Sequence, residues 1–295
     1  MAEAPLFERL CLVGVGLIGS SIARAARKAK LAGSIVATDA SAEVRRRIVE
    51  LGLVESAPAD PAEAVRGADC VILCTPLGTY KDIVRRIAPN LRPGAILSDV
   101  GSVKSCVLAD VGALVPKGVH LVPGHPVAGT EHSGPDAGFA EIFEGRWAIL
   151  TPPAGADAGA VERLTRFWAG LGSTVEIMDA ARHDLTLAIT SHLPHLIAYT
   201  IVGTAAELEN VTAAEVIRYS AGGFRDFTRI AGSNPVMWRD IFLDNKEAVL
   251  EMLGRFSEDL TALQRAIRYG DGKTLEDWFT RTRAIRRGVI EAKQA

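Results

Sequence analysis

A glycine-rich turn, GVGLIG from Gly14 to Gly19, constrains the fold of this chain more than any other feature. It directly follows the apolar run LCLV and directly precedes the helical pattern SSIARAARKA. In a strand-turn-helix unit that binds a dinucleotide, the first glycine allows a tight turn and the second lets the backbone approach the pyrophosphate. The third glycine lets the helix pack closely on the strand. The turn therefore predicts a Rossmann-type, doubly wound α/β sheet with a dinucleotide site at its first strand.

Short apolar runs alternate with helical patterns as far as about Leu150. These runs are rich in Val, Ile and Leu and lack polar alternation, which is typical of parallel strands covered on both faces. After the Pro-, Gly- and Ala-rich segment TPPAGADAGA, a helix (AVERLTRFWAGLG) and a strand (STVEIMD) follow, and we expect them to complete the same mostly parallel sheet. The other expected strands are SIVATDA, ADCVILCTP, GAILSDVGS, HLVPG and WAILTPP.

Strand signals stop near Ala180, and long amphipathic helices follow. These patterns are HDLTLAITSHLPHLIAYTIVGTAAEL, the run from Asn234 to Gly270, and a last helix that ends at the C-terminus. We therefore predict two domains: residues 1–180 bind the dinucleotide, and residues 181–295 form an all-helical domain for substrate binding and dimerisation. The many Leu, Ile, Phe and Trp residues of the helical domain favour a homodimer that buries them.

Composition excludes several classes of protein. The chain is 48% hydrophobic and 23% charged with a net charge of -2, so it is an ordinary globular protein without the basic stripe that nucleic acid binding requires. We find neither a signal peptide nor an apolar run that approaches the roughly 20 residues of a membrane span. We interpret the four cysteines as small buried residues of a reducing compartment. We expect a cytoplasmic protein that binds neither nucleic acid nor a membrane.

Asp39 favours NAD over NADP as the cofactor. It ends the run SIVATD, twenty residues after Gly19, where a carboxylate accepts hydrogen bonds from the ribose hydroxyls and repels a 2'-phosphate. The alternative role of Asp39 is a helix N-cap, which Ser41 could fill equally well. TPLGTY follows another expected strand and should line the cofactor. The expected cofactor-binding residues are Gly14, Gly16, Leu17, Ile18, Gly19, Asp39, Thr75 and Pro76.

His125 is the best candidate for a catalytic base. It lies in GHPVAGTEHSGPDAG, directly after the apolar run HLVPG, and therefore at the carboxyl edge of an expected strand beside the cofactor. Hydride transfer from an alcohol needs a group that accepts the hydroxyl proton, and the ordinary pKa of histidine suits this role near neutral pH. Ser102 in SDVGSVK follows the preceding strand with Lys104, and its hydroxyl could reach the same reacting oxygen.

Two further constellations fall in the helical domain. In SHLPH, Ser191, His192 and His195 share a predicted helix, and histidines three residues apart can face the crevice together. A zinc site is an alternative, but no acidic or thiol ligand stands at a matching spacing, so we expect no metal. In GGFRDFTRIAGSNPVMWRD, Arg225 or Arg229 could bind a substrate carboxylate, and the alternative is an Arg to Asp pair on a helix surface.

The motifs GVGLIGSS, DVGSVK, GHPVAGTEHSG, SHLPH and GFRDFTRIA with MWRDIF occur together and in order over nearly the whole chain. In this the chain resembles the prephenate and arogenate dehydrogenases of tyrosine biosynthesis, and among them the cyclohexadienyl dehydrogenases. The resemblance implies an NAD-dependent oxidative decarboxylation of prephenate or arogenate to 4-hydroxyphenylpyruvate or tyrosine. It implies that His125 accepts the 4-hydroxyl proton, that Ser102 binds the same oxygen and that Arg229 holds a carboxylate. The full set of expected substrate-binding residues is Arg229, His195, Ser191, Thr130, Glu131, Arg225 and Trp238.

Some alternatives stay open at this point. Glu131 could pair with an active-site histidine, gate the pocket or cap a loop, and in contact with substrate its charge would favour the amino group of arogenate. Prephenate and arogenate offer the same ring, hydroxyl and ring carboxylate, so the sequence does not choose between them. Another NAD(P)-dependent dehydrogenase of the 3-hydroxyacid dehydrogenase type would share the glycine turn but needs no GHPVAGTE and DFTR pair. A nucleotide-sensing dimer without catalysis would not need His125, Ser102 and Arg229 together.

Overall fold

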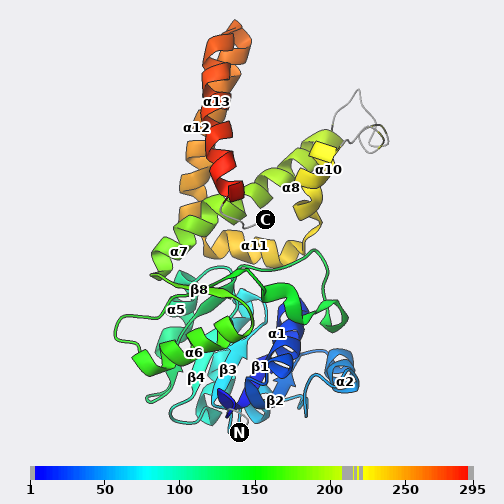
Figure 1. The fold of residues 1–295 in the computed structure, drawn as a ribbon, viewed down its shortest axis with the longest axis vertical. Helices are drawn as coiled ribbons and strands as arrows, with labels where there is room; N and C mark the ends of the chain where they lie inside the picture. Colours follow the sequence, from blue (N-terminus) through cyan, green and yellow to red (C-terminus); the bar gives the residue numbers. More distant parts are fainter. Residues whose placement is uncertain (1–3, 208–214, 216–217, 219–221, 292–295) are drawn as a thin grey trace. The chain divides into compact units, whose positions relative to one another are not determined.

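Five parallel strands form the first sheet, in the order β2, β1, β3, β4, β5 (Figure 1). Successive strand residues face opposite sides, and both sides are covered. Leu12 and Ile72 join a core with helix α1, whereas Cys11 and Val71 join a second core with helices α4 and α5. This two-sided burial explains why the strands read as unbroken apolar runs. The strands are β1 (Phe7–Val13), β2 (Ala32–Thr38), β3 (Cys70–Leu73), β4 (Ile96–Asp99) and β5 (His120–Leu121).

The helices of the nucleotide-binding part connect these strands. Helix α1 follows β1 directly and contributes a run of small buried residues, including Ala23 and Ala26, to the first core. The largest fully buried side chain, Trp168, comes from α6 and packs edge-to-face on Phe143 and Phe167. These helices are α1 (Leu17–Lys28), α2 (Ala42–Glu50), α3 (Pro61–Ala64), α4 (Tyr80–Ile87), α5 (Ser105–Val111) and α6 (Ala158–Gly170).

A second, three-stranded sheet departs from the sequence expectation of one continuous sheet. Its strands β6 (Gly124–Pro126), β7 (Trp147–Leu150) and β8 (Thr174–Ile177) pair in that order, with β6 antiparallel to β7 and β7 parallel to β8. Alternate residues of β5 donate to β4, and the last of these backbone bonds runs from Val122 N to Leu97 O. The next amide on that side, Gly124 N, donates to the Asp99 side chain at 3.2 Å instead of to a backbone carbonyl, and Thr151 N donates to Pro123 O. The chain thereby leaves the first sheet just before His125.

Within the described part of the chain, helices alone follow Asp179, as expected, although two of them are interrupted. A π-helical turn (Ala188–His192) separates α7 (Ala180–Leu187) from α8 (Leu193–Ala206), and the expected end of this pattern at Leu208 lies outside the described residues. The single helix expected from Asn234 to Gly270 is wrong, because the chain leaves helical geometry at Asn245. The remaining helices are α10 (Gly222–Thr228), α11 (Pro235–Asp244), α12 (Lys246–Tyr269) and α13 (Gly272–Glu291).

The computed structural model describes residues 4–207, 215, 218 and 222–291. The chain divides into two units, Met1–Asn245 and Lys246–Ala295. In the second unit α12 and α13 pack against each other as a helical hairpin, and large apolar side chains such as Leu260, Ile267 and Phe279 are exposed on it. The domain boundary that the sequence places at residue 180 stays a prediction.

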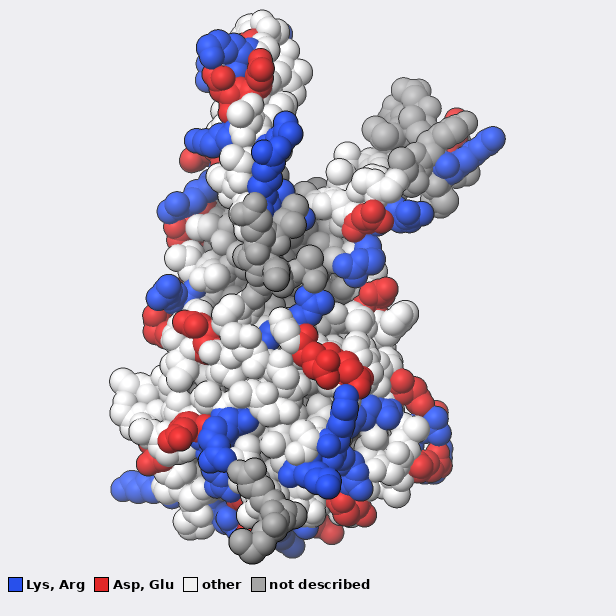
Figure 2. All heavy atoms as spheres, viewed as in Figure 1, with Lys and Arg blue, Asp and Glu red and all other residues white. Residues whose placement is uncertain are grey.

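Surface charges of both signs are mixed. On the face drawn in Figure 2, basic and acidic side chains lie next to one another rather than gathering in one area of a single sign. Surface ion pairs account for part of this pattern, for example Arg47 with Asp136 at 2.6 Å and Lys28 with Glu141 at 2.7 Å. Such mixing is unlike the basic stripe that contacts a phosphate backbone.

One helical segment contradicts the expectation that no apolar run reaches the length of a membrane span. By length and composition alone, Ala180–Ala206 could cross a membrane, with a mean hydropathy of 1.4 and 28% of the apolar window buried. Within it, however, His183, Asp184 and His192 are buried and hydrogen-bonded to other parts of the protein. These contacts are typical of a helix that packs on a globular domain.

Candidate active site

The glycine turn has the shape of a dinucleotide cradle. Gly14 has a φ of 91°, and a Cβ there would lie 2.7 Å from the Thr75 side chain and 2.9 Å from the Cys74 carbonyl. A Cβ on Gly19 would collide with the carbonyl oxygen of Gly14. Above Gly16, by contrast, a Cβ would meet none of the described residues within 4 Å, and none of their side chains caps the helix that begins at Leu17. The open space and the free amides of α1 fit a pyrophosphate.

Asp39 connects the end of β2 to this turn. Its Oδ2 accepts a hydrogen bond from Val15 N at 2.9 Å, and its Oδ1 accepts one from Ser41 N at 2.9 Å. The N-cap of α2 is Ser41, whose Oγ accepts from Val44 N, so the alternative role of Asp39 as that cap does not apply. Arg45 donates to the backbone carbonyl of Asp39 at 2.7 Å. The carboxylate is half-buried and stands where the ribose of a dinucleotide would meet it.

The other expected cofactor residues lie around the turn. Thr75 packs against Gly14, and its hydroxyl is 2.8 Å from that of Thr79. Pro76 is exposed in the loop that follows β3, at the carboxyl edge of the sheet. Leu17 and Ile18 open helix α1 and are half-buried. These positions are consistent with the expected roles.

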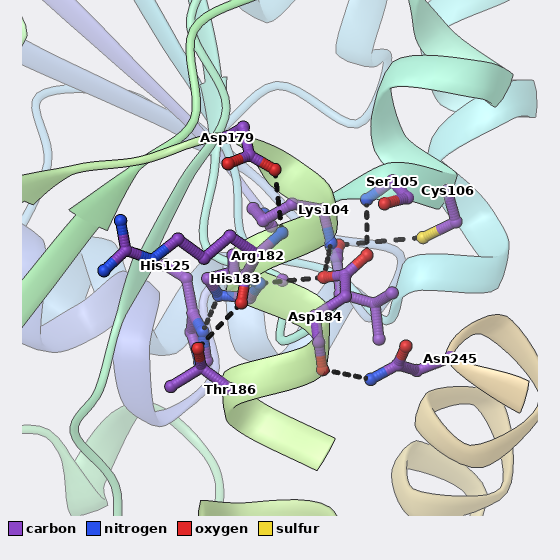
Figure 3. Close-up of polar contacts among 12 residues, drawn as sticks. Lys104, Ser105, Cys106, His125, Asp179, Arg182, His183, Asp184, Thr186 and Asn245 are labelled. Carbon is purple, nitrogen blue, oxygen red and sulfur yellow. Dashed lines mark hydrogen bonds and ion pairs between the residues drawn. The ribbon is translucent and has the colours of Figure 1, made fainter. Parts of the chain in front are cut away.

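His125 lies on β6 and takes part in a buried chain of polar contacts (Figure 3). Its side chain is only 8% exposed, and its Nδ1 lies 2.9 Å from Nε2 of His183. On the other side of that ring, His183 Nδ1 lies 2.8 Å from Asp184 Oδ1. Within the described part of the chain, Nε2 of His125 has no hydrogen-bond partner. The contacts leave one ring nitrogen of His125 available to a ligand.

Asp184 is fixed by the start of helix α5. The backbone amides of Lys104 and Ser105 donate to its two carboxylate oxygens, each at 2.8 Å. The Lys104 side chain is itself fully buried, where it pairs with Asp99 and donates to Gly124 O at 2.7 Å. Lys104 is therefore a structural cation that ties β4 to β6, a role that the sequence pattern does not predict.

Burial keeps the rings of His125 and His183 neutral in the resting protein. It lowers the pKa of His125 well below the usual value, and the neighbouring His183 and Lys104 lower it further. Burial also lowers the pKa of His183, despite the opposing effect of Asp184. Burial would raise the pKa of Asp184, but hydrogen bonds from His183 and from the start of α5 outweigh it and lower this pKa. The resting cluster therefore holds neutral rings next to an ionised carboxylate.

His192 and His195 both contact Trp238, as their spacing on one helical face suggested. The His195 ring stacks on Trp238 with centroids 3.7 Å apart, and the His192 ring meets Trp238 edge-on at 6.0 Å. His195 Nδ1 lies 2.8 Å from the carbonyl oxygen of Ser191, whereas His192 Nδ1 lies 3.0 Å from Asn245 Nδ2. Asn245 also donates to Asp184 O at 2.9 Å. The break between α11 and α12 thus places an amide inside the polar cluster.

Arg229 and Glu131 form an ion pair at 3.4 Å between the end of α10 and the loop after β6. This contact brings together two expected substrate residues that are far apart in the sequence. Arg225 instead pairs with Asp226 at 3.6 Å on the exposed face of α10, as its alternative interpretation predicted.

Three more expected site residues lie in loops or turns. Thr130 accepts a bond from His132 N at 3.3 Å. Ser102 is half-buried, and its hydroxyl has no hydrogen-bond partner among the residues that the structure describes. Ser191 is half-buried in the π-helical turn. Among the described residues, no group of three or more His, Cys, Asp or Glu is placed to hold a metal ion.

His183 and Asp184 are not among the site residues that the sequence predicts. The pattern HDLTL indicates only the start of an amphipathic helix. The signal that could have found them is an adjacent His and Asp near the start of an otherwise apolar helix, because buried titratable groups are rare without a partner. The partners, however, come from segments 58 to 80 residues away, which no local pattern reveals.

Comparison with known proteins covers most of the chain. The family model for the nucleotide-binding domain of prephenate dehydrogenase matches residues 22–177, and the model for its dimerization domain matches residues 179–281. A cyclohexadienyl dehydrogenase from Zymomonas mobilis is 41% identical over 281 residues, which cover 95% of this chain and 96% of the relative.

Solved structures give the same result. Prephenate dehydrogenase from A. aeolicus in complex with hydroxyphenyl propionate and NAD+ has a TM-score of 0.88 and 32% identity, covering 96% of this chain and 98% of the other. Arogenate dehydrogenase from Synechocystis has a TM-score of 0.80 and 26% identity, covering 95% of this chain and 99% of the other.

Proposed function

Because this chain belongs to the prephenate dehydrogenase family, with both family domains present, we propose which residues carry the family's activity and which molecules they handle. The activity itself is that of a prephenate or cyclohexadienyl dehydrogenase in tyrosine biosynthesis. The observation that carries the assignment of residues is the buried His125. One nitrogen of its ring is engaged by His183, and the other has no partner within the described residues.

We infer that the dinucleotide is NAD. The turn from Gly14 to Gly19 and the free N-terminus of α1 fit the pyrophosphate, and Asp39 would accept hydrogen bonds from the ribose hydroxyls. A 2'-phosphate would stand against the negative charge of Asp39, so NADP fits less well. The family relative from A. aeolicus was solved with NAD+, which agrees with this assignment. Bound NAD would supply the acceptor for the hydride.

His125 is the general base of the proposed reaction. It accepts the proton of the 4-hydroxyl as the hydride leaves C4, which turns the alcohol into a ketone. The bond between the ring and its carboxylate then breaks, its electron pair enters the ring, and carbon dioxide departs. The phenolate oxygen formed in this way recovers a proton from His125, so the base is regenerated. Aromatisation makes the overall step effectively irreversible.

Other side chains bind and orient the substrate. Ser102 follows β4, and its hydroxyl, which has no hydrogen-bond partner among the described residues, can donate to the reacting oxygen. Arg229 lies close to Glu131, and its planar guanidinium suits a substrate carboxylate. His195, held on Trp238 by stacking, presents its Nε2 to the substrate because its Nδ1 is engaged by Ser191 O. Thr130 and Ser191 complete the proposed set of substrate contacts.

We propose that both prephenate and arogenate are substrates, since they share the ring, the hydroxyl and the ring carboxylate. The chain carries the family's dimerization domain, and we propose that it forms a homodimer through its helical part. Exposed apolar side chains on the α12–α13 hairpin, such as Leu260 and Phe279, support this. The proposed location is the cytoplasm.

The direct test measures NADH formation by the purified protein with NAD, supplied with prephenate and arogenate in parallel. Turnover of both substrates is the expected result, and the ratio of the two kcat/KM values gives the preference. A parallel assay with NADP tests the cofactor. If neither substrate reacts while NAD still binds, the proposed roles of these residues are wrong. Comparing both substrates with Glu131→Gln tests whether the charge of Glu131 favours arogenate.

The first prediction concerns His125→Asn. Asparagine keeps a polar side chain but cannot accept the proton, so we expect kcat to fall roughly 100- to 10,000-fold, as for the loss of a positioned general base. NAD affinity, measured by fluorescence titration, should stay within error of the unsubstituted protein. An unchanged kcat would rule out His125 as the base.

A further inference from the structure

We propose that Asp184 and His183 are positioning residues that fix the tautomer of His125, so that its Nε2 is always the unprotonated nitrogen. This inference deepens the proposed function and rests on it, because it identifies which ring nitrogen of His125 accepts the substrate proton. The observation that carries it is the continuous chain Asp184, His183, His125, with contacts of 2.8 and 2.9 Å (Figure 3).

The chain of contacts begins at a carboxylate that can only accept. Asp184 receives the amide protons of Lys104 and Ser105, and nothing in this arrangement would stabilise a proton on its own oxygens. The contact between Asp184 Oδ1 and His183 Nδ1 therefore requires the proton to sit on Nδ1 of His183. A bare nitrogen facing the carboxylate would place two lone pairs against each other.

The proton on Nδ1 of His183 in turn determines what the other nitrogen of this ring can do. His183 is fully buried near the cation of Lys104, and its lowered pKa keeps it neutral, so its Nε2 carries a lone pair. That lone pair accepts a hydrogen bond from His125, which places the only ring proton of His125 on Nδ1. Nε2 of His125 is left as an acceptor, which is the state that a general base needs.

The charges of the cluster also favour uptake of the substrate proton by His125. The groups that face His125 or its neighbours are Asp99 and Lys104 as a buried ion pair, the neutral rings of His183 and His192, and the carboxylate of Asp184. The Asp99 and Lys104 charges cancel, so the resting cluster has one uncompensated negative charge on Asp184. When His125 takes up the substrate proton, the new positive charge balances it through the His183 ring, as in a catalytic triad.

A direct test is the tautomeric state of His125 by nitrogen NMR on protein labelled with 15N histidine, without substrate. The chain has only six histidines, and the spectrum of His125→Asn identifies the signal that belongs to His125. We expect Nδ1 protonated and Nε2 unprotonated at neutral pH, and Nδ1 protonated in His183. A His125 ring protonated on Nε2 would overturn the proposal.

Kinetics of two substitutions at His183 give an independent test. His183→Leu removes the acceptor for His125 Nδ1, so we expect kcat to fall about 10- to 1,000-fold, within the range that a positioned base contributes, with little change in KM. His183→Gln keeps an oxygen that can accept this bond and should retain a clearly larger share of kcat. Unchanged kcat in His183→Leu, or equal losses in both variants, would contradict the proposal.

The matched control is Asp179→Asn. Asp179 caps the same helix by accepting from Arg182 N but takes no part in the chain of contacts, so this variant should keep the tautomer and the kcat of the unsubstituted protein. Loss of activity in the control would mean that damage to α7 alone explains the effect. A protein that turns over neither substrate would disprove the proposed function, yet the NMR result would still decide the tautomer.

Discussion

At the residue scale, the structure pairs Arg229 with Glu131, a partner that the sequence did not predict. The sequence predicts a carboxylate clamp, and the structure places Arg229 3.4 Å from Glu131, with the arginine 60% exposed. An exposed pair of this kind contributes little to stability. Arg229 can therefore exchange Glu131 for a substrate carboxylate at small cost.

We expect Arg229→Ala to act mainly on substrate binding. A charge-assisted hydrogen bond to a carboxylate contributes about 1.5 to 3 kcal/mol, which corresponds to a rise in KM of roughly 10- to 200-fold. Steady-state kinetics with prephenate measure this. Arg225→Ala is a natural comparison, because Arg225 pairs with Asp226 on the same helix. A variant in which only kcat falls would count against the clamp.

Residues with a local signal are the ones that the sequence could assign. The glycines of the turn and Asp39 each follow an apolar run that predicts a strand, so their place at the carboxyl edge of a sheet follows from the pattern. His125 also follows such a run, but it lies within β6 of the second sheet, which the pattern does not predict. His183 and Lys104 have no such signal, since their importance depends on partners from distant segments. The structural role of the buried Lys104 follows only from its contacts with Asp99 and Gly124 O.

At the element scale, single polar residues decide where elements end. The sequence predicts the strands of the nucleotide-binding part other than β6, but not the division into two sheets, because the Asp99 side chain takes the amide of Gly124 that would continue the first ladder. The long helix expected from Asn234 to Gly270 has an unbroken apolar period, yet Asn245 interrupts it. Tertiary hydrogen bonds compensate for this break, because the Asn245 amide donates to a backbone carbonyl of α7 and to the ring of His192.

Asn245→Ala should therefore destabilise the protein more than the loss of an exposed cap. It leaves Asp184 O and His192 Nδ1 without their donor, and each buried group left unpaired costs about 1 to 3 kcal/mol. Asn234→Ala, which removes the N-cap of α11, should cost only about 1 kcal/mol. Chemical denaturation of both variants measures the difference. Equal costs would mean that the amide of Asn245 contributes nothing beyond a helix end.

At the scale of the whole molecule, buried neutral histidines make stability depend on pH. Burial lowers the pKa of His192 to about 4, and that of His125 and His183 is also lowered. Above about pH 6.5 the histidines are neutral in both the folded and the unfolded chain. As the pH falls from there toward 4, only the unfolded chain takes up these protons, so the free energy of unfolding decreases.

We expect His192 alone to account for on the order of 3 kcal/mol of this loss between about pH 6.5 and 4, since one pKa unit corresponds to about 1.4 kcal/mol. Calorimetric unfolding at a series of pH values measures it. His192→Asn should flatten the decrease, whereas substitution of the exposed His132 should leave it unchanged. If both variants follow the unsubstituted protein, the His192 ring is not the source.

The chain from Asp184 to His125 also bears on how such a protein can be inherited or engineered. His125 belongs to the segment that matches the nucleotide-binding model, whereas His183 and Asp184 belong to the segment that matches the dimerization model. Neither half contains the whole chain of contacts. If His125 is the base, a chimera that joins the first half of one relative to the second half of another must preserve this contact across the junction. We therefore expect recombination at residue 178 to give an active protein only between parents that share both sides of the contact.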